Sequence, residues 1–422
     1  MKRNTHIWQK TLVSMVVSSL LLGGCALPVE QTSSGVSMPS GWGERGDQVK
    51  ISPEGVPNFS WWQRFGSTEL IEMVLLAQSG GYDVAAAAAR VRQADARARM
   101  AGASLLPEVT GNVNASRDKD VGEPSTRSYT MGLSASYEVD IWGEKRASRL
   151  SAMASRDAAV FAHDAVLLTL MASTAQSYLR TVAWRERVAI ARYNLTAAER
   201  VLGLVESRYR VGSASAQETA QQRTLVASLR QVLALRQQQE HQSLTTLAVL
   251  LGRPPQKLTV RAVSLSSMKA PTVESGLPTD LLTRRPDVAA AERRLAAADA
   301  DVTVARAAML PTVRLTASYG VGSDRVRDVL DNPIYNLAAG LVAPIFNNGR
   351  LAAGRDLSLA RREELLADYR ASIISSLGDV ENALNALQGS AKQQEAHQEV
   401  LVHGREGTHD EVIVRWPINR KA

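Results

Sequence analysis

The sequence predicts an α+β membrane protein that combines very long helices with two hairpins of alternating strands. One helical stretch runs without proline from Glu144 to about Arg208, which is far longer than the helices of ordinary globular domains. Two regions change from helical periodicity to alternation of apolar and polar residues directly after Pro107 and Pro311. These two prolines lie 204 positions apart, which indicates that the chain repeats one structural plan.

The N-terminal residues predict an export signal followed by a lipid attachment site. A basic start precedes an apolar run that is too short to span a bilayer as a helix, so residues 1–24 are expected to form a signal peptide. The run ends in a sequence that resembles the lipobox of bacterial lipoproteins, namely Leu22, Gly23, Gly24 and Cys25. Cys25 is the single cysteine of the chain and cannot form an internal disulfide. We therefore expect a covalent lipid, palmitate included, on Cys25. The alternative is an ordinary signal peptide whose cleavage site happens to contain cysteine.

The segment that follows is expected to connect the lipid to the fold. Residues 25–60 are rich in Ser, Gly and Pro, which predicts a lipidated, extended tether. Ala26, rather than an aspartate, follows the cysteine, and in lipoprotein sorting this points to the outer membrane.

The charge of the chain favours solvated helices over a nucleic-acid site. The formal net charge is +7, which by itself is compatible with nucleic-acid binding. The arginines, however, are spread along helical patterns and mixed with Glu and Asp. We therefore expect solvated helix faces and no nucleic-acid partner.

Residues 61–252 are interpreted as the first repeat. Two helical pieces, broken at a pair of glycines, precede Pro107, which ends the second piece because proline cannot continue a helix. The long helix follows the strands, and the turn "RYRVGSASAQE" leads into a return helix. The alternating residues between the helices predict two strands, at about 108–117 and 128–141.

Residues 276–406 are interpreted as the second repeat, with strands expected at about 313–322 and 334–346. A long helix follows, but the helical pattern fails from about residue 407. The return helix of this repeat is therefore expected to be missing, and residues 407–422 are expected to be an atypical tail. Our hypothesis is a truncated or frameshifted product, which would compromise the gate and the stability of the assembly.

The strands predict a barrel that several chains must share. Their alternation, their length and their small polar face suit strands that cross a bilayer. Four strands cannot close a barrel, and an open edge in lipid would leave backbone groups without hydrogen bonds. Three chains would supply twelve strands. The helices would then extend from the periplasmic end of that barrel, and the two hairpin loops would face the outside.

Several motifs together resemble one known family. They are "WWQRF", "SYEVDIWGEKRA", "RYRVGSASAQE", "PIFNNGR" and, most specifically, the stretch from Gly276 to Leu315. The chain is similar in these to the outer membrane factor (TolC-like) family, and most of all to its lipoprotein branch. The resemblance implies a homotrimer with a twelve-strand outer-membrane β-barrel and a long periplasmic α-helical barrel. It also implies a passive exit duct for small molecules such as drugs, toxic compounds or secondary metabolites, with no cofactor beyond the covalent lipid.

The resemblance further implies three kinds of partner: outer-membrane lipid, a periplasmic adaptor protein and an inner-membrane transporter. Two other functions remain open at this point. One is a type I protein-secretion channel, which uses the same architecture but whose branch usually lacks a lipobox. The other is a structural periplasmic lipoprotein without an open pore, which the strand alternation disfavours.

The sequence offers no catalytic constellation and no metal motif. None of the six histidines belongs to an HExxH motif or pairs with cysteine for zinc. The carboxylates of most interest are Glu138 and Asp140, at the end of the second strand on its polar face. They are expected at the junction of barrel and helices, either as structural caps or as groups that line the lumen.

Overall fold

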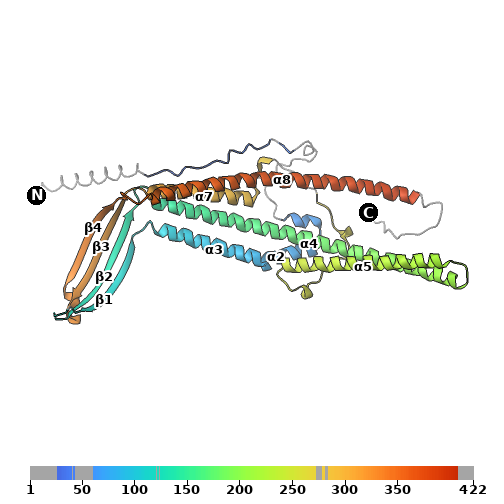
Figure 1. The fold of residues 1–422 in the computed structure, drawn as a ribbon, viewed down its shortest axis with the longest axis horizontal. Helices are drawn as coiled ribbons and strands as arrows, with labels where there is room; N and C mark the ends of the chain where they lie inside the picture. Colours follow the sequence, from blue (N-terminus) through green and yellow to red (C-terminus); the bar gives the residue numbers. More distant parts are fainter. Residues whose placement is uncertain are drawn as a thin grey trace.

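The computed structural model describes residues 26–39, 41–42, 60–119, 121–122, 124–271, 278–280 and 284–406. The expected signal peptide, the lipobox with Cys25 and the expected tail over 407–422 lie outside these residues. The described part is elongated, with a β-sheet at one end and long helices running away from it (Figure 1).

The sheet has four antiparallel strands in the order β1-β2-β3-β4. Each hairpin pairs internally, and β2 also pairs with β3 along eleven positions, from Tyr129 opposite Ser323 to Val139 opposite Val313. The outer edges of β1 and β4 have no strand partner within the described chain. The strands are β1 (Glu108–Asp118), β2 (Thr126–Val139), β3 (Thr312–Ser323) and β4 (Pro333–Val342).

Two strands end earlier than the sequence analysis expected. β2 ends at Val139 instead of 141, because Asp140 turns toward the next helix. β4 ends at Val342 instead of 346, and Pro344 follows two residues later. Proline has no N–H to give to a strand ladder, which accounts for the shorter strand.

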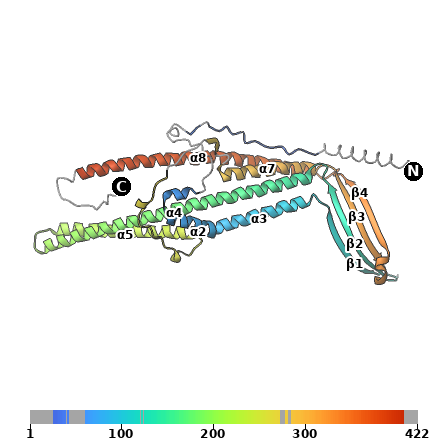
Figure 2. The same cartoon turned by 180° about the vertical axis from the view of Figure 1, so that it is seen from behind.

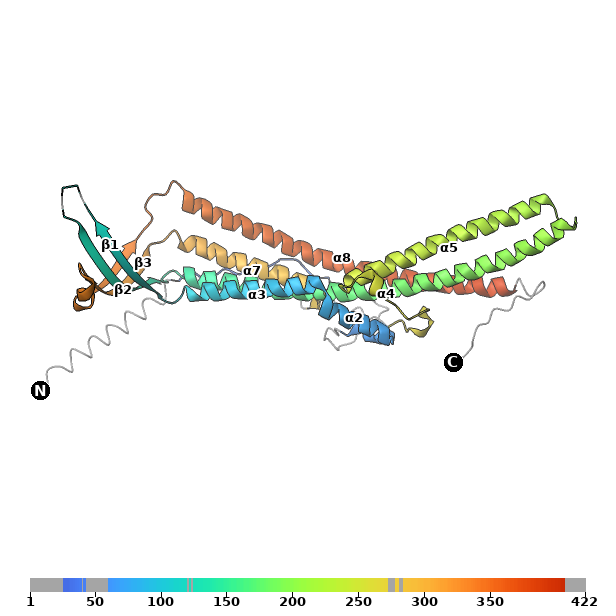
Figure 3. The same ribbon diagram turned by 90° about the horizontal axis from the view of Figure 1, so that it is seen from below.

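The longest helix is α4 (Glu144–Arg210), whose 67 residues correspond to a length of about 100 Å. It turns at Gly212, which has a positive φ of 79°, and returns as α5 (Ala216–Leu250). A capping box starts α5: the Ser215 hydroxyl accepts from the N–H of Glu218, and the Glu218 carboxylate accepts from the N–H of Ser215. The resulting hairpin forms the end of the molecule farthest from the sheet (Figure 3).

The other helices lie beside α4 near the sheet. α3 contacts α4, α4 contacts α7, and α7 contacts α8, so these four helices form a layer (Figure 2). The helices α3 and α7 have 22 residues each and begin at Tyr82 and Pro286, again 204 positions apart. The bounds are α2 (Thr68–Gly80), α3 (Tyr82–Ala103), α7 (Pro286–Ala307) and α8 (Arg350–Glu406).

The main hydrophobic core lies where α2 and α5 meet the middle of α4. Leu70 and Val74 of α2, Met171 and Tyr178 of α4, and Leu247 of α5 are each at most 1% exposed. Among the described helices, α4 alone contains an 18-residue window apolar enough to cross a membrane by length and composition, with a mean hydropathy of 1.5. Of that window, 28% is buried against the rest of the chain, so length and composition alone do not assign α4 to a membrane.

The described part of the expected tether packs against the helices. Residues 26–39 are extended, but they lie along α7 and α8 (Figure 1). Val36 and Met38 pack against the second hydrophobic cluster, which includes Leu295 and Ile373. We call residues 26–39 the strap.

Candidate functional site

One face of the sheet is apolar across all four strands. The strand register places the odd-numbered residues of every strand on this face, as in Leu133 opposite Tyr319 and Tyr319 opposite Tyr335. A contiguous apolar surface of this kind marks contact with lipid or with protein. Large side chains on it are each at least 40% exposed: Val109, Val113, Met131, Leu133, Leu315, Tyr319, Tyr335, Leu337 and Leu341.

The opposite face of the sheet carries mostly small and polar side chains, with Ile334 and Val342 near the two ends of β4 as exceptions. One row crosses all four strands through Thr110, Ser134, Ser318 and Asn336, which the register places opposite one another in that order. In the next row Gly132 lies opposite Gly320, and a Cβ added at Gly132 would come 3.0 Å from the Tyr319 carbonyl oxygen. Such a face suits contact with water rather than with lipid.

The junction between sheet and helices is held by Asp140. Its carboxylate accepts hydrogen bonds from the backbone N–H of Lys145 at 2.9 Å and of Arg146 at 3.1 Å, and from the Arg146 guanidinium at 2.9 Å. These N–H groups belong to the first turn of α4, where no helical carbonyl can accept from them. Gly143, with a φ of 83°, makes the tight turn that brings Asp140 over the helix start.

The electrostatics at this junction favour an ionised Asp140. Burial raises the pKa of this carboxyl, but the hydrogen bonds from Lys145 and Arg146 and the charge of Arg146 outweigh that effect and lower it overall. A negative charge at the start of α4 also interacts favourably with the helix dipole.

Glu138 lies at the same junction, two residues before Asp140. Its carboxylate is 3.6 Å from the Lys145 ammonium and 3.5 Å from the Arg314 guanidinium of β3. The indole N–H of Trp142, just after β2, donates to the carbonyl of Pro311, just before β3, at 2.6 Å and so links the two repeats at this junction. Both candidate carboxylates therefore contact cations in the closed junction of sheet and helices.

The strap is attached to the helices by polar contacts along its length. Thr32 donates to the Asp299 carboxylate from its backbone N–H at 2.8 Å and from its hydroxyl at 2.6 Å. Glu30 forms an ion pair of 3.1 Å with Arg306 of α7, and the Arg370 guanidinium of α8 donates to the Ser34 carbonyl at 2.7 Å.

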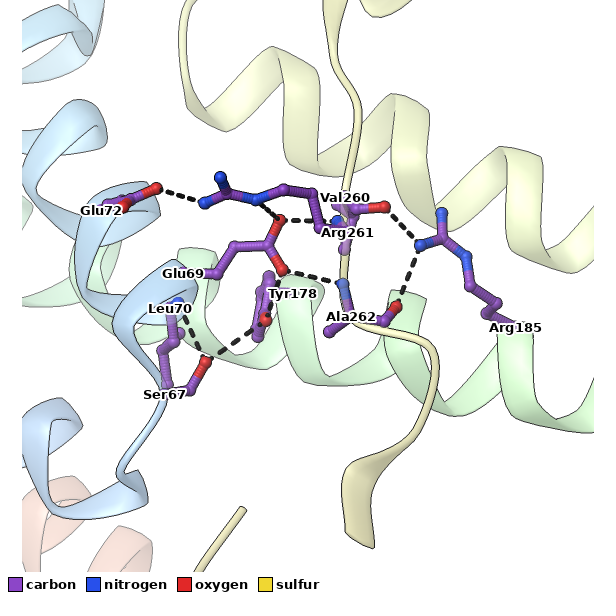
Figure 4. A network of polar contacts seen from close by, with 9 residues as sticks. All are labelled: Ser67, Glu69, Leu70, Glu72, Tyr178, Arg185, Val260, Arg261 and Ala262. Carbon is purple, nitrogen blue, oxygen red and sulfur yellow. Dashed lines mark hydrogen bonds and ion pairs between the residues drawn. The ribbon is translucent and has the colours of Figure 1, made fainter. Parts of the chain in front are cut away.

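A polar network around Glu69 joins α2, α4 and the segment after α5 (Figure 4). The Glu69 carboxylate is 7% exposed and accepts from the N–H of Arg261 at 2.6 Å, the N–H of Ala262 at 2.9 Å and the Tyr178 hydroxyl at 3.0 Å. From the other side, the Arg185 guanidinium donates to the carbonyls of Val260 and Ala262. The backbone of residues 260–262 is thus held through its N–H groups by Glu69 and through its carbonyl groups by Arg185.

The sequence analysis did not find Glu69. The sequence around Glu69 indicates only the start of a helix, because Ser67 caps α2 and acidic residues are common in a first helical turn. Its partners Arg261 and Ala262 lie 192 and 193 positions away, and no sequence pattern connects them.

A sheet with one apolar face and two open edges, joined to helices that project far beyond it, is typical of a subunit of an outer-membrane channel. The profile of the outer membrane efflux protein family matches residues 75–253 and 277–407. The chain therefore belongs to the outer membrane efflux protein family. The members of this family are TolC-like channels of the outer membrane.

Two related sequences carry the description pyoverdine export outer membrane protein OpmQ. The protein from Pseudomonas aeruginosa is 46% identical over 405 residues, which cover 92% of this chain and 84% of the relative. The protein from Pseudomonas putida is 43% identical over 399 residues, with the same coverage of 92% and 84%.

Solved structures of related channels have the same fold. A structure of CusC has a TM-score of 0.79 at 25% identity and covers 90% of this chain and 86% of its own. The Campylobacter jejuni CmeC outer membrane channel has a TM-score of 0.80 at 22% identity and covers 92% and 85%. The expected family, the outer-membrane location and the combination of helices and sheet are thus confirmed.

Proposed function

We propose that this chain forms the outer-membrane exit duct of a tripartite efflux pump and conducts small molecules passively. Three chains would share one twelve-strand barrel and continue it as a helical barrel in the periplasm. The observation that carries this proposal is the apolar sheet face, because a face of this kind suits contact with lipid. In lipid, the open edges of β1 and β4 need strand partners from other chains.

The relatives suggest the cargo and the partners. OpmQ is described as a pyoverdine export protein at 46% identity, so a secreted metabolite of the pyoverdine type is our first candidate for the cargo. Export from the cell through an outer-membrane duct requires an energy source at the inner membrane. We therefore propose an inner-membrane transporter and a periplasmic adaptor as partners.

We also propose that Cys25 carries a lipid anchor. The backbone N–H of Leu27 donates to the carbonyl of Trp142 at 3.1 Å, and Trp142 directly follows β2 at the junction. Leu27, two residues after Cys25 in the sequence, is thus held at the junction of sheet and helices, which supports an anchor on the membrane side of the strap.

The two alternatives make different demands. A type I secretion duct would pass unfolded protein and would not depend on a small-molecule transporter. A non-conducting lipoprotein would have no use for a sheet with one apolar face, and the apolar side chains of β1 to β4 therefore favour the duct.

The oligomer is the first test of the proposal. Protein purified from membranes in mild detergent should migrate as a trimer when unheated and as a monomer after boiling, with a β-sheet signal in circular dichroism. A monomer in every mild detergent would contradict the shared barrel.

A further inference from the structure

A pocket on the helical layer is lined by side chains that have no role in the proposed duct so far. It lies between α3, α4 and α7 and has a volume of about 350 Å³, which is within the usual range for small-molecule sites. Its walls are mostly small and apolar, with four alanines and one valine. Arg90 of α3, His163 of α4 and Arg294 of α7 also line it, and Nδ1 of His163 lies 3.0 Å from the Asp164 carboxylate.

The two arginines are available for a ligand. Across the described part of the chain, neither Arg90 nor Arg294 has a carboxylate within ion-pair distance, and no acidic side chain lines the pocket. Their positions differ by 204, the offset that also separates the starts of α3 and α7. The two guanidinium groups therefore come from corresponding positions of two similar helices on either side of α4.

The pocket faces away from the segments that cover the helices. Nine residues of an α-helix correspond to a rotation of about 180°. Arg294 is nine residues from Thr303, whose hydroxyl donates to the Pro28 carbonyl of the strap at 3.4 Å. On α4, the pocket residue Ala162 is nine residues from Met171, which lies in the core with α2.

The strap and α2 thus lie on the far side of the layer from the pocket. In a duct whose wall is one helix thick, segments on the inner side would block the bore, so these segments belong outside. The pocket then opens toward the interior of the duct. The direction in which the pocket opens rests on the proposed function. The residues that line the pocket do not depend on it.

We propose that the pocket is an anion subsite that binds the carboxylate group of a small, partly apolar molecule between Arg90 and Arg294. The planar guanidinium presents paired N–H donors that match a carboxylate, and the alanine walls accept an apolar body. In a trimer the site would occur once per chain, so a carboxylate-bearing cargo would meet several equivalent sites at one level of the duct.

The test uses 2-naphthoate as the probe and its neutral analogue 2-naphthamide as the control ligand. Binding to the purified full-length protein is measured by calorimetry in detergent at low salt, because salt screens exposed charges. We expect naphthoate to bind at least about tenfold more tightly than naphthamide, since a charge-assisted pair is involved. We also expect R90Q/R294Q to remove that preference and R90K/R294K to weaken it.

The matched control is R92Q/R293Q, which removes the same charge from neighbouring exposed positions that do not line the pocket. It should bind naphthoate like the wild type. Equal affinity for both ligands, unchanged binding in R90Q/R294Q or an equal loss in R92Q/R293Q would overturn the proposal.

Channel conductance of the same samples separates this proposal from the proposed function. Naphthoate binding that depends on Arg90 and Arg294 in a protein without conductance would support the anion site and contradict the duct. Conductance without such binding would contradict the anion site alone.

Discussion

The Thr32 hydroxyl donates a 2.6 Å hydrogen bond to the Asp299 carboxylate, although the two residues are 267 positions apart. The backbone N–H of Thr32 donates to the second carboxylate oxygen, and Asp299 is only 4% exposed. Burying a polar side chain costs free energy unless its polar atoms form hydrogen bonds, and Thr32 supplies one to each carboxylate oxygen of Asp299. The strap is therefore part of the folded helical layer, and Thr32 is one of its attachments to α7.

The first prediction concerns this attachment. Thr32→Val keeps the shape of the side chain but leaves Asp299 without the hydroxyl donor, so local opening of the strap should become easier by about 1–3 kcal/mol. Hydrogen exchange of the backbone amide at position 32, corrected for its intrinsic rate, measures that opening. Ser37→Ala, at an exposed strap position, is the control and should leave the exchange rate unchanged. Equal exchange in wild type and Thr32→Val would show that the strap is held by other contacts.

The second prediction concerns the Glu69 network. In Glu69→Gln an NH₂ group replaces one acceptor oxygen and faces another donor, so a buried N–H or O–H loses its partner. We expect a destabilisation of about 1–3 kcal/mol, seen as faster exchange of the Arg261 and Ala262 amides. Glu72→Gln is the matched control, because Glu72 is exposed and its ion pair with Arg261 is worth little. Slow exchange of both amides in Glu69→Gln would refute the role of this carboxylate.

The same network predicts a dependence on pH. Burial raises the pKa of Glu69, but the hydrogen bonds from Arg261, Ala262 and Tyr178 and the charge of Arg261 lower it overall, below the usual 4.5. A lowered pKa in the folded state means that the stabilisation is complete above about pH 4.5 and is lost as the pH falls through the folded-state value. Amide exchange at Arg261, corrected for its intrinsic rate, should therefore accelerate below pH 4.5 in the wild type. In Glu69→Gln it should not; parallel pH profiles would contradict this assignment.

The fourth prediction concerns the start of α4. Asp140→Ala removes the acceptor for the N–H groups of Lys145 and Arg146, and the loss of such a cap costs about 0.5–2 kcal/mol. Exchange of these two amides should accelerate, and Asp140→Asn, which keeps one oxygen, should be intermediate. Asp157→Asn, at an exposed ion pair within α4, should have no effect on them. If Asp140→Ala exchanges like the wild type, Asp140 does not act as a cap.

The fifth prediction concerns the lipid anchor. Cys25→Ser removes the thiol that would carry the diacylglyceryl group, so metabolic labelling with palmitate should mark the wild type and leave the variant unlabelled. Ser19→Ala, within the apolar run, should be labelled normally. A labelled Cys25→Ser protein would contradict the proposed anchor.

Local patterns predicted the elements better than the contacts between them. Helix-to-strand changes at Pro107 and Pro311 located β1 and β3, because proline and residue alternation act over a few positions. The ends of β2 and β4 were missed, since they depend on the turn at Asp140 and on Pro344. Asp140 and Glu138 were found from their place on the strand.

The Glu69 network and the docking of the strap could not be predicted in this way. Glu69 meets Arg261, and Thr32 meets Asp299, only after helices far apart in the sequence have packed together. The pocket between Arg90 and Arg294 is of the same kind, because each arginine alone is indistinguishable from any other exposed helix residue.

The measurement that tests the duct most directly is the single-channel conductance of the purified oligomer in a planar lipid bilayer. We expect discrete, stable conductance steps that require the trimer and disappear when the protein is boiled before insertion. A correctly folded, bilayer-inserted trimer that shows no conductance under any applied voltage would contradict the proposed duct and favour a structural lipoprotein.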